Sequence, residues 1–122
     1  MSKSGMSNKR IVLAATLDVV AIMVFVFIGR RNHDEGTTLR GVVRVAAPFL
    51  IGLAVGWIVA RAWKAPTSTT TGMVIWPVTV AVGMLLRRAA FHNGTALAFI
   101  IVASLFTGLL LVGWRALYSL RK

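Results

Sequence analysis

One acidic residue lies within a long apolar run. Asp18 is near the middle of residues 11 to 29, which are almost all apolar. If that run crosses a membrane, an acid at its centre costs about 2.5 to 3.5 kcal/mol on insertion scales. Such an acid either couples a proton or cation to transport, or is a structural acid held by an arginine or by hydroxyl groups of another helix.

The predicted partner of Asp18 is Arg87, which enters the third apolar run from the opposite side and follows Gly83. Arg115 and Arg44 are second choices. With a rise of about 1.5 Å per residue, Asp18 lies slightly to one side of the membrane midplane and Arg87 lies on the other. A stretched guanidinium would then be needed to join the two, and removing either partner of such a buried pair would be costly.

Basic residues also gather at the side of the predicted bundle away from the chain termini. This far rim could bind lipid phosphates, attract an anionic solute or dock an acidic partner, and ordinary interfacial arginines would give the same pattern. Its two histidines have no carboxylate or thiol at ligand spacing, so no metal site is predicted, and no cofactor is expected. The residues are Arg30, Arg31, His33, Arg40, Arg44, Arg88 and His92, next to Arg87.

The sequence motifs of common enzyme classes are missing. There is no nucleophile elbow, phosphate loop or metalloprotease helix, and the other two acids, Asp34 and Glu35, are adjacent residues of one connecting segment. The absence of cysteine excludes disulfides and thiol chemistry. We therefore expect a protein that is not an enzyme.

The elements that must position these residues are transmembrane helices. Of 122 residues, 57% are hydrophobic and only 14% are charged, which is more apolar surface than a soluble domain of this size can bury. Four apolar runs, at about 11–29, 42–60, 73–90 and 96–114, approach the roughly 20 residues that a spanning helix needs. The prediction is an all-α integral membrane four-helix bundle, a single transmembrane domain over residues 1–122.

The net charge of +11 then points to the bilayer's anionic headgroups rather than to nucleic acid. Eight Lys and Arg residues fall on the side of the termini and six on the other, which favours cytoplasmic termini by a small margin. Gly52, Gly56 and Ala60 recur every four residues and predict a helix-packing face, within the monomer or between protomers.

Several short motifs stand out along the chain: Asp18, Gly29-Arg30 with His33, Pro48-Phe49-Leu50, Arg87 and Trp114-Arg115. Together they resemble a family of small prokaryotic membrane proteins with four spans, the domain-of-unknown-function family 3054. The resemblance runs from about Leu17 to Arg115. The family implies an integral inner-membrane protein and supplies no activity, so no catalytic residue is carried over.

Two functions follow as hypotheses. The first is a structural or accessory membrane component, in which the pair of Asp18 sets the helix registry and the basic rim contacts lipid or another membrane protein. The second is a small ion- or proton-coupled transporter or channel that uses Asp18. It would be a homo-oligomer, because one four-helix bundle has little interior for a solute path.

Overall fold

The computed structural model describes residues 3–32, 39–89 and 97–120, which form four long helices and one short turn. The long helices are α1 (Lys3–Asn32), α2 (Leu39–Ala60), α3 (Thr69–Ala89) and α4 (Leu97–Leu120). A 3-10 turn, η1 (Ala62–Lys64), lies between α2 and α3. The described part of the chain contains no strand, so the all-α prediction is confirmed.

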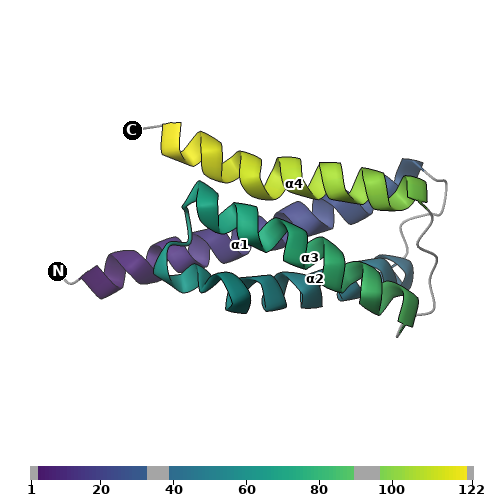
Figure 1. The fold of residues 1–122 in the computed structure, drawn as a ribbon, viewed down its shortest axis with the longest axis horizontal. Coiled ribbons are helices and arrows are strands. Elements are labelled where there is room, and N and C mark those ends of the chain that lie inside the picture. The colour runs from purple at the N-terminus through teal and green to yellow at the C-terminus, as the bar shows by residue number, and fades with distance from the viewer. Residues whose placement is uncertain (1–2, 33–38, 90–96, 121–122) are drawn as a thin grey trace.

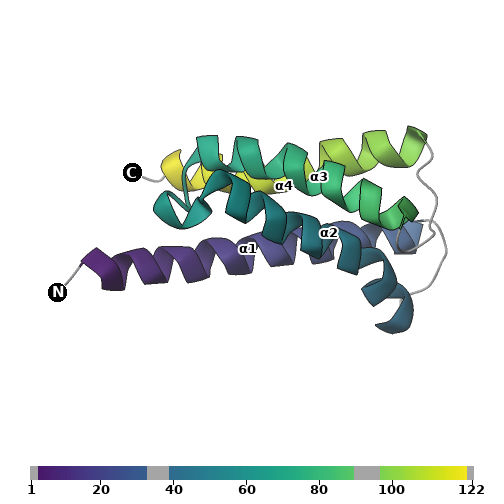
Figure 2. The ribbon, with the colours of Figure 1, turned by 60° about the horizontal axis from the view of Figure 1, so that its bottom comes forward.

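The four helices run side by side, and each is antiparallel to the next along the chain (Figure 1). We call the end that holds the start of α1, η1 and the end of α4 the near end, and the opposite end the far end. Helix α1 packs against α2 and α4, and α3 packs against both α2 and α4. Figure 2 shows α2 and α3 lying close together above α1.

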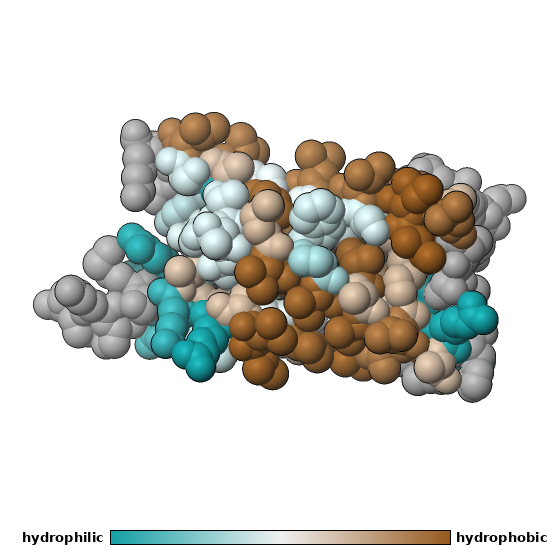
Figure 3. Space-filling model, in the orientation of Figure 1, coloured by the Kyte–Doolittle hydropathy of each residue, from teal (hydrophilic) through white to brown (hydrophobic). Residues whose placement is uncertain are grey.

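All four helices are long and apolar enough to cross a membrane. Their outward surfaces agree with this, because large apolar side chains such as Leu109 and Ile58 are 72% and 67% exposed. A broad hydrophobic band covers the middle of the molecule, and hydrophilic side chains gather at its two ends (Figure 3). A surface this apolar is the kind that lipid covers in a multi-span membrane protein.

Each of the four long helices extends beyond the apolar run that predicted it, and the extensions of α3 and α4 bear on the site. Helix α3 begins at Thr69, with the Gly72 amide donating to the Ser68 carbonyl at 3.2 Å, although the apolar run starts only at Met73. Helix α4 continues to Leu120, six residues beyond the predicted end at Trp114. An apolar run in the sequence ends at its first polar residues, whereas the backbone hydrogen bonds of the helix can continue through those residues. Arg115 is therefore inside α4 rather than at its end.

The small-residue face of α2 lies against α3 of the same chain. A methyl group on Gly52 would come within 2.6 Å of the Thr79 carbonyl oxygen, and one on Gly56 within 3.2 Å of the Ile75 carbonyl oxygen. Ala60, one turn beyond Gly56, is half-buried at the end of the helix. The two backbones approach closely because glycine leaves no side chain between them.

Aromatic packing fills the bundle towards the far end. Phe25 of α1 meets Phe49 of α2 edge to face, with ring centroids 5.5 Å apart, and its ring lies 5.9 Å from that of Phe106 in α4. Such contacts join three helices without polar groups. Asp18 is seven residues earlier in α1, about two turns nearer to the near end.

Candidate functional site

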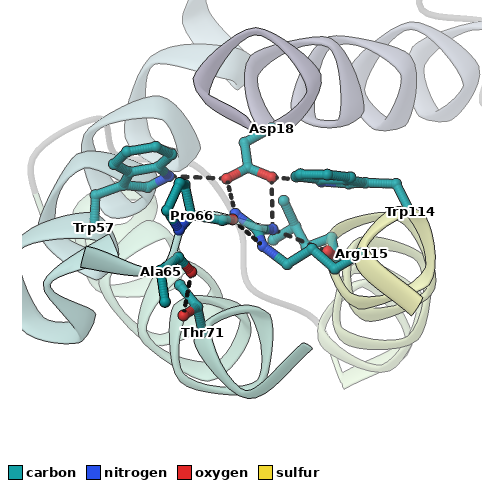
Figure 4. Close-up of polar contacts among 8 residues, drawn as sticks. Asp18, Trp57, Ala65, Pro66, Thr71, Trp114 and Arg115 are labelled. Atoms are coloured by element: carbon teal, nitrogen blue, oxygen red, sulfur yellow. Dashed lines mark hydrogen bonds and ion pairs between the residues drawn. The ribbon is translucent and has the colours of Figure 1, made fainter. Parts of the chain in front are cut away.

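The Asp18 carboxylate accepts four hydrogen bonds from three side chains (Figure 4). Arg115 donates from Nη1 to Oδ1 and from Nη2 to Oδ2, both at 2.8 Å. The indole Nε1 of Trp57 donates to Oδ2, and that of Trp114 donates to Oδ1, again at 2.8 Å. We call these four residues the Asp18 clasp.

The guanidinium of Arg115 is held on its other sides as well. Its Nε donates to the Pro66 carbonyl at 2.9 Å, and Nη1 donates to the Leu111 carbonyl at 3.0 Å. Its central carbon lies 4.5 Å from the ring centroid of Trp114, a cation–π distance. Asp18 and Arg115 are both 0% exposed. The paired charges cancel, and bidentate geometry is the arrangement that best offsets the desolvation of two buried ions.

Helix direction explains why these side chains meet. In an α-helix the Cα–Cβ bond tilts towards the N-terminus. Helices α2 and α4 both end at the near end, so Trp57, Trp114 and Arg115 lean from there into the bundle. Helix α1 starts at the near end, so Asp18 leans back towards them. The four side chains converge although their backbones differ in depth.

The connection between α2 and α3 folds into the bundle to complete the clasp. Arg61 adopts a left-handed conformation (φ 51, ψ 52), which turns the chain sharply at the end of α2. Ala62 and Pro66 are buried, and the Ala65 carbonyl accepts a hydrogen bond from the Thr71 hydroxyl at 2.7 Å. This shape presents the Pro66 carbonyl to the guanidinium.

A glycine in α3 makes room for the arginine. A methyl group on Gly72 would come within 2.9 Å of Arg115 Cδ and 3.3 Å of the Leu111 carbonyl oxygen. The clasp therefore draws on every long helix: α1 supplies the acid, α2 and α4 supply the donors, and α3 supplies the space.

The predicted pairing of Asp18 with Arg87 is wrong, because Arg115, a second choice from the sequence, is the partner. Arg87 lies in the last turn of α3, at the far end. Two facts were not visible in the sequence. Helix α4 extends past Arg115, and this side chain reaches back along its own helix to the level of Asp18.

The far rim is only partly described. Arg40 and Arg44 are exposed in the first turns of α2, and Arg88 is exposed in the last turn of α3, so these three share the far end. Arg30 and Arg31 belong to the last turn of α1. His33 and His92 lie outside the described residues. Within the described ranges, no group of three acidic, histidine or cysteine residues could hold a metal ion.

The two tryptophans of the clasp were not predicted as partners of Asp18, although their chemistry offered a signal. An indole N–H in an apolar span needs an acceptor, and Asp18 is the one acid within a span. The same requirement is met differently at Trp76, whose Nε1 donates to the Ser104 carbonyl of α4 at 2.7 Å. Trp63, in η1, is in contrast 45% exposed.

Removing one indole donor should weaken the bundle measurably. We expect Trp114→Phe to lower the free energy of unfolding by about 1.5 to 3 kcal/mol, the usual contribution of a hydrogen bond to a charged group. Reversible unfolding in mixed detergent micelles measures the change. Trp63→Phe is the matched control, since this exposed indole lies outside the clasp. Equal losses in the two variants would show that Trp114 contributes nothing through Asp18.

Comparison with known protein families identifies a match over most of the chain. A family model described as "Protein of unknown function (DUF3054)" matches residues 15–118, a range that contains all four residues of the clasp. No curated protein matches the chain, and no solved structure matches it.

Proposed function

We propose that this chain, which belongs to the DUF3054 family, is a structural or accessory component of the cell membrane and has no enzymatic activity. The supporting observation is the saturation of the Asp18 carboxylate by four donors in a fully buried site. Its chemistry is that of a fixed anion that holds helices together.

Proton coupling would require a different site. A carboxyl group that carries a proton needs a route to water and a free oxygen on which to bind it. Here each oxygen already accepts two hydrogen bonds, one from Arg115 and one from an indole. A proton on either oxygen would have to displace one of those donors. The arrangement therefore favours the structural hypothesis over the transporter alternative.

We further propose that both termini face the cytoplasm. Membrane orientation follows the number of Lys and Arg residues outside the membrane core on each side. Arg115 is buried in the clasp and is left out of this number, so seven basic residues remain on the near side against six on the far side. The near side still holds the larger number, including Lys9 and Arg10 directly before the first span, where orientation is usually decided. The near-side residues are Lys3, Lys9, Arg10, Arg61, Lys64, Arg121 and Lys122, and the far-side residues are Arg30, Arg31, Arg40, Arg44, Arg87 and Arg88.

Flux measurements test the functional choice. Purified protein in liposomes that carry a pH gradient should show no proton flux above that of protein-free liposomes, and Asp18→Asn should behave identically. A flux that is present in the wild type and absent in Asp18→Asn would reject the structural proposal.

Crosslinking in native membranes addresses the accessory role. We expect the chain to be recovered with one other membrane protein at a fixed stoichiometry. Recovery of a homodimer alone would favour the transporter alternative, because a bundle this small needs a second copy to enclose a path.

A further inference from the structure

The near end carries cationic side chains that the clasp does not use. Lys9 and Arg10 in α1 are exposed, as are Arg61, which directly precedes η1, and Lys64, which is the last residue of η1. Helix α1 and η1 pack together, so the four cations share one end of the bundle. Figure 3 shows hydrophilic side chains at this end, beside the hydrophobic band.

Among the described residues Asp18 is the one acid, and it does not neutralise these cations. Of the three acidic residues, Asp18 is buried with Arg115. Asp34 and Glu35 stand in the sequence between α1 and α2, whose adjoining ends lie at the far end. Among the described residues, the near end therefore presents basic charge with no acid beside it.

The connection after α2 separates buried from exposed side chains. Ala62 is fully buried, whereas Trp63 is 45% exposed and Lys64 is exposed. In the preceding turn of α2, Ile58 and Val59 are 67% and 58% exposed. Exposed apolar side chains, an exposed indole and two exposed cations thus lie within residues 58–64. These are the kinds of side chain that contact the acyl chains, the glycerol region and the phosphate of a phospholipid.

We propose that Arg61, Trp63 and Lys64, with Lys9 and Arg10 beside them, form a binding surface for the headgroup of an anionic phospholipid. The basic side chains contact the phosphate, the Trp63 indole lies at the level of the glycerol region, and the acyl chains pass along the exposed apolar side chains of α2.

The bound lipid also stabilises the clasp. The Pro66 carbonyl that accepts the Arg115 hydrogen bond is two residues beyond Lys64 in the same connection. A headgroup that holds the connection in place restricts the motion of this acceptor. Binding to the folded protein alone raises its melting temperature through mass action.

The test is a lipid titration of the full-length protein in a nonionic detergent, with melting temperature as the readout. Phosphatidylglycerol should raise the melting temperature saturably, and phosphatidylcholine and inorganic phosphate should not. In Arg61→Asn/Lys64→Gln, the half-saturating phosphatidylglycerol concentration should rise about 25-fold, or about fivefold for each basic side chain near a membrane surface. Asparagine is chosen at position 61 because it tolerates the left-handed conformation.

The matched comparison is Arg40→Gln/Arg44→Gln, which removes two exposed charges at the far end and should raise the half-saturating concentration much less than the near-end double variant does. Equal shifts with phosphatidylglycerol and phosphatidylcholine would overturn the proposal. Equal weakening in the two double variants would overturn the assignment to this surface.

A second measurement does not depend on the charge variants. Brominated phosphatidylglycerol at a low fraction in unbrominated phosphatidylcholine should quench more tryptophan fluorescence in the wild type than in Trp63→Phe. Brominated phosphatidylcholine at the same fraction should give a smaller difference between the two proteins. Equal quenching of Trp63 by both brominated lipids would contradict a preference for the anionic headgroup.

Discussion

Replacing Arg115 by methionine is expected to lower the free energy of unfolding by about 3 to 5 kcal/mol, the usual loss when one partner of a buried ion pair is removed. Methionine keeps an unbranched apolar stem, so most of the packing survives and the main change is electrostatic. Asp18 would then remain buried as an unpaired carboxylate with only the indoles of Trp57 and Trp114 as donors. Reversible unfolding in mixed detergent micelles measures the loss.

Arg44→Met is the control for that substitution. This arginine is exposed at the far end, so replacing it with the same side chain should change the free energy of unfolding by much less. If Arg115→Met were no more destabilising than Arg44→Met, the buried pair would contribute nothing to stability.

The second large effect is expected at Gly52, where the backbones of α2 and α3 approach closely. Gly52→Ala should lower the free energy of unfolding by about 1 to 3 kcal/mol, since overpacking of a tight contact forces backbone shifts. The added methyl group would lie 2.6 Å from the Thr79 carbonyl oxygen and 3.1 Å from the Gly83 amide nitrogen. Both are backbone atoms, so a side-chain rotation cannot relieve the clash.

Gly113→Ala is the matched control in α4. A methyl group there meets nothing within 4 Å, so alanine should be neutral or raise the free energy of unfolding by up to about 1 kcal/mol through its higher helix propensity. The changes in the free energy of unfolding should have opposite signs in the two variants, which separates the effect of packing from that of helix propensity. A gain in stability for Gly52→Ala would show that α2 and α3 are not in close contact there.

The number and class of the helices could be predicted from the sequence because the bilayer imposes them. Apolar runs of about 20 residues must satisfy their backbone hydrogen bonds internally, so hydropathy alone indicates spanning helices. Helix ends were less predictable. Residues 69–72 and Arg115 lie outside the predicted apolar runs, yet both belong to helices. Arg115 also donates a hydrogen bond to the Leu111 carbonyl of its own helix.

The importance of Asp18 could also be predicted, since an acid within a span needs a partner. The identity of that partner could not be predicted, because the positions of several arginines along their predicted spans placed them at similar distances from Asp18. Arg115 pairs with Asp18 because α4 extends beyond it and because side chains point towards the N-terminus of their helix. The Pro66 carbonyl, in a connection that folds into the bundle, also accepts a hydrogen bond from Arg115. None of these is a property of a single helix, so a pattern along the sequence does not contain them.

A double-mutant cycle on Asp18 and Arg115 tests the central claim, that the clasp is a structural ion pair, most directly. The free energies of unfolding of the wild type, Asp18→Asn, Arg115→Met and the double variant are compared in mixed micelles. We expect the double variant to lose less stability than the sum of the single losses, because the second change removes a charge that the first left unpaired. Strictly additive losses would contradict a coupled pair and with it the structural role proposed for Asp18.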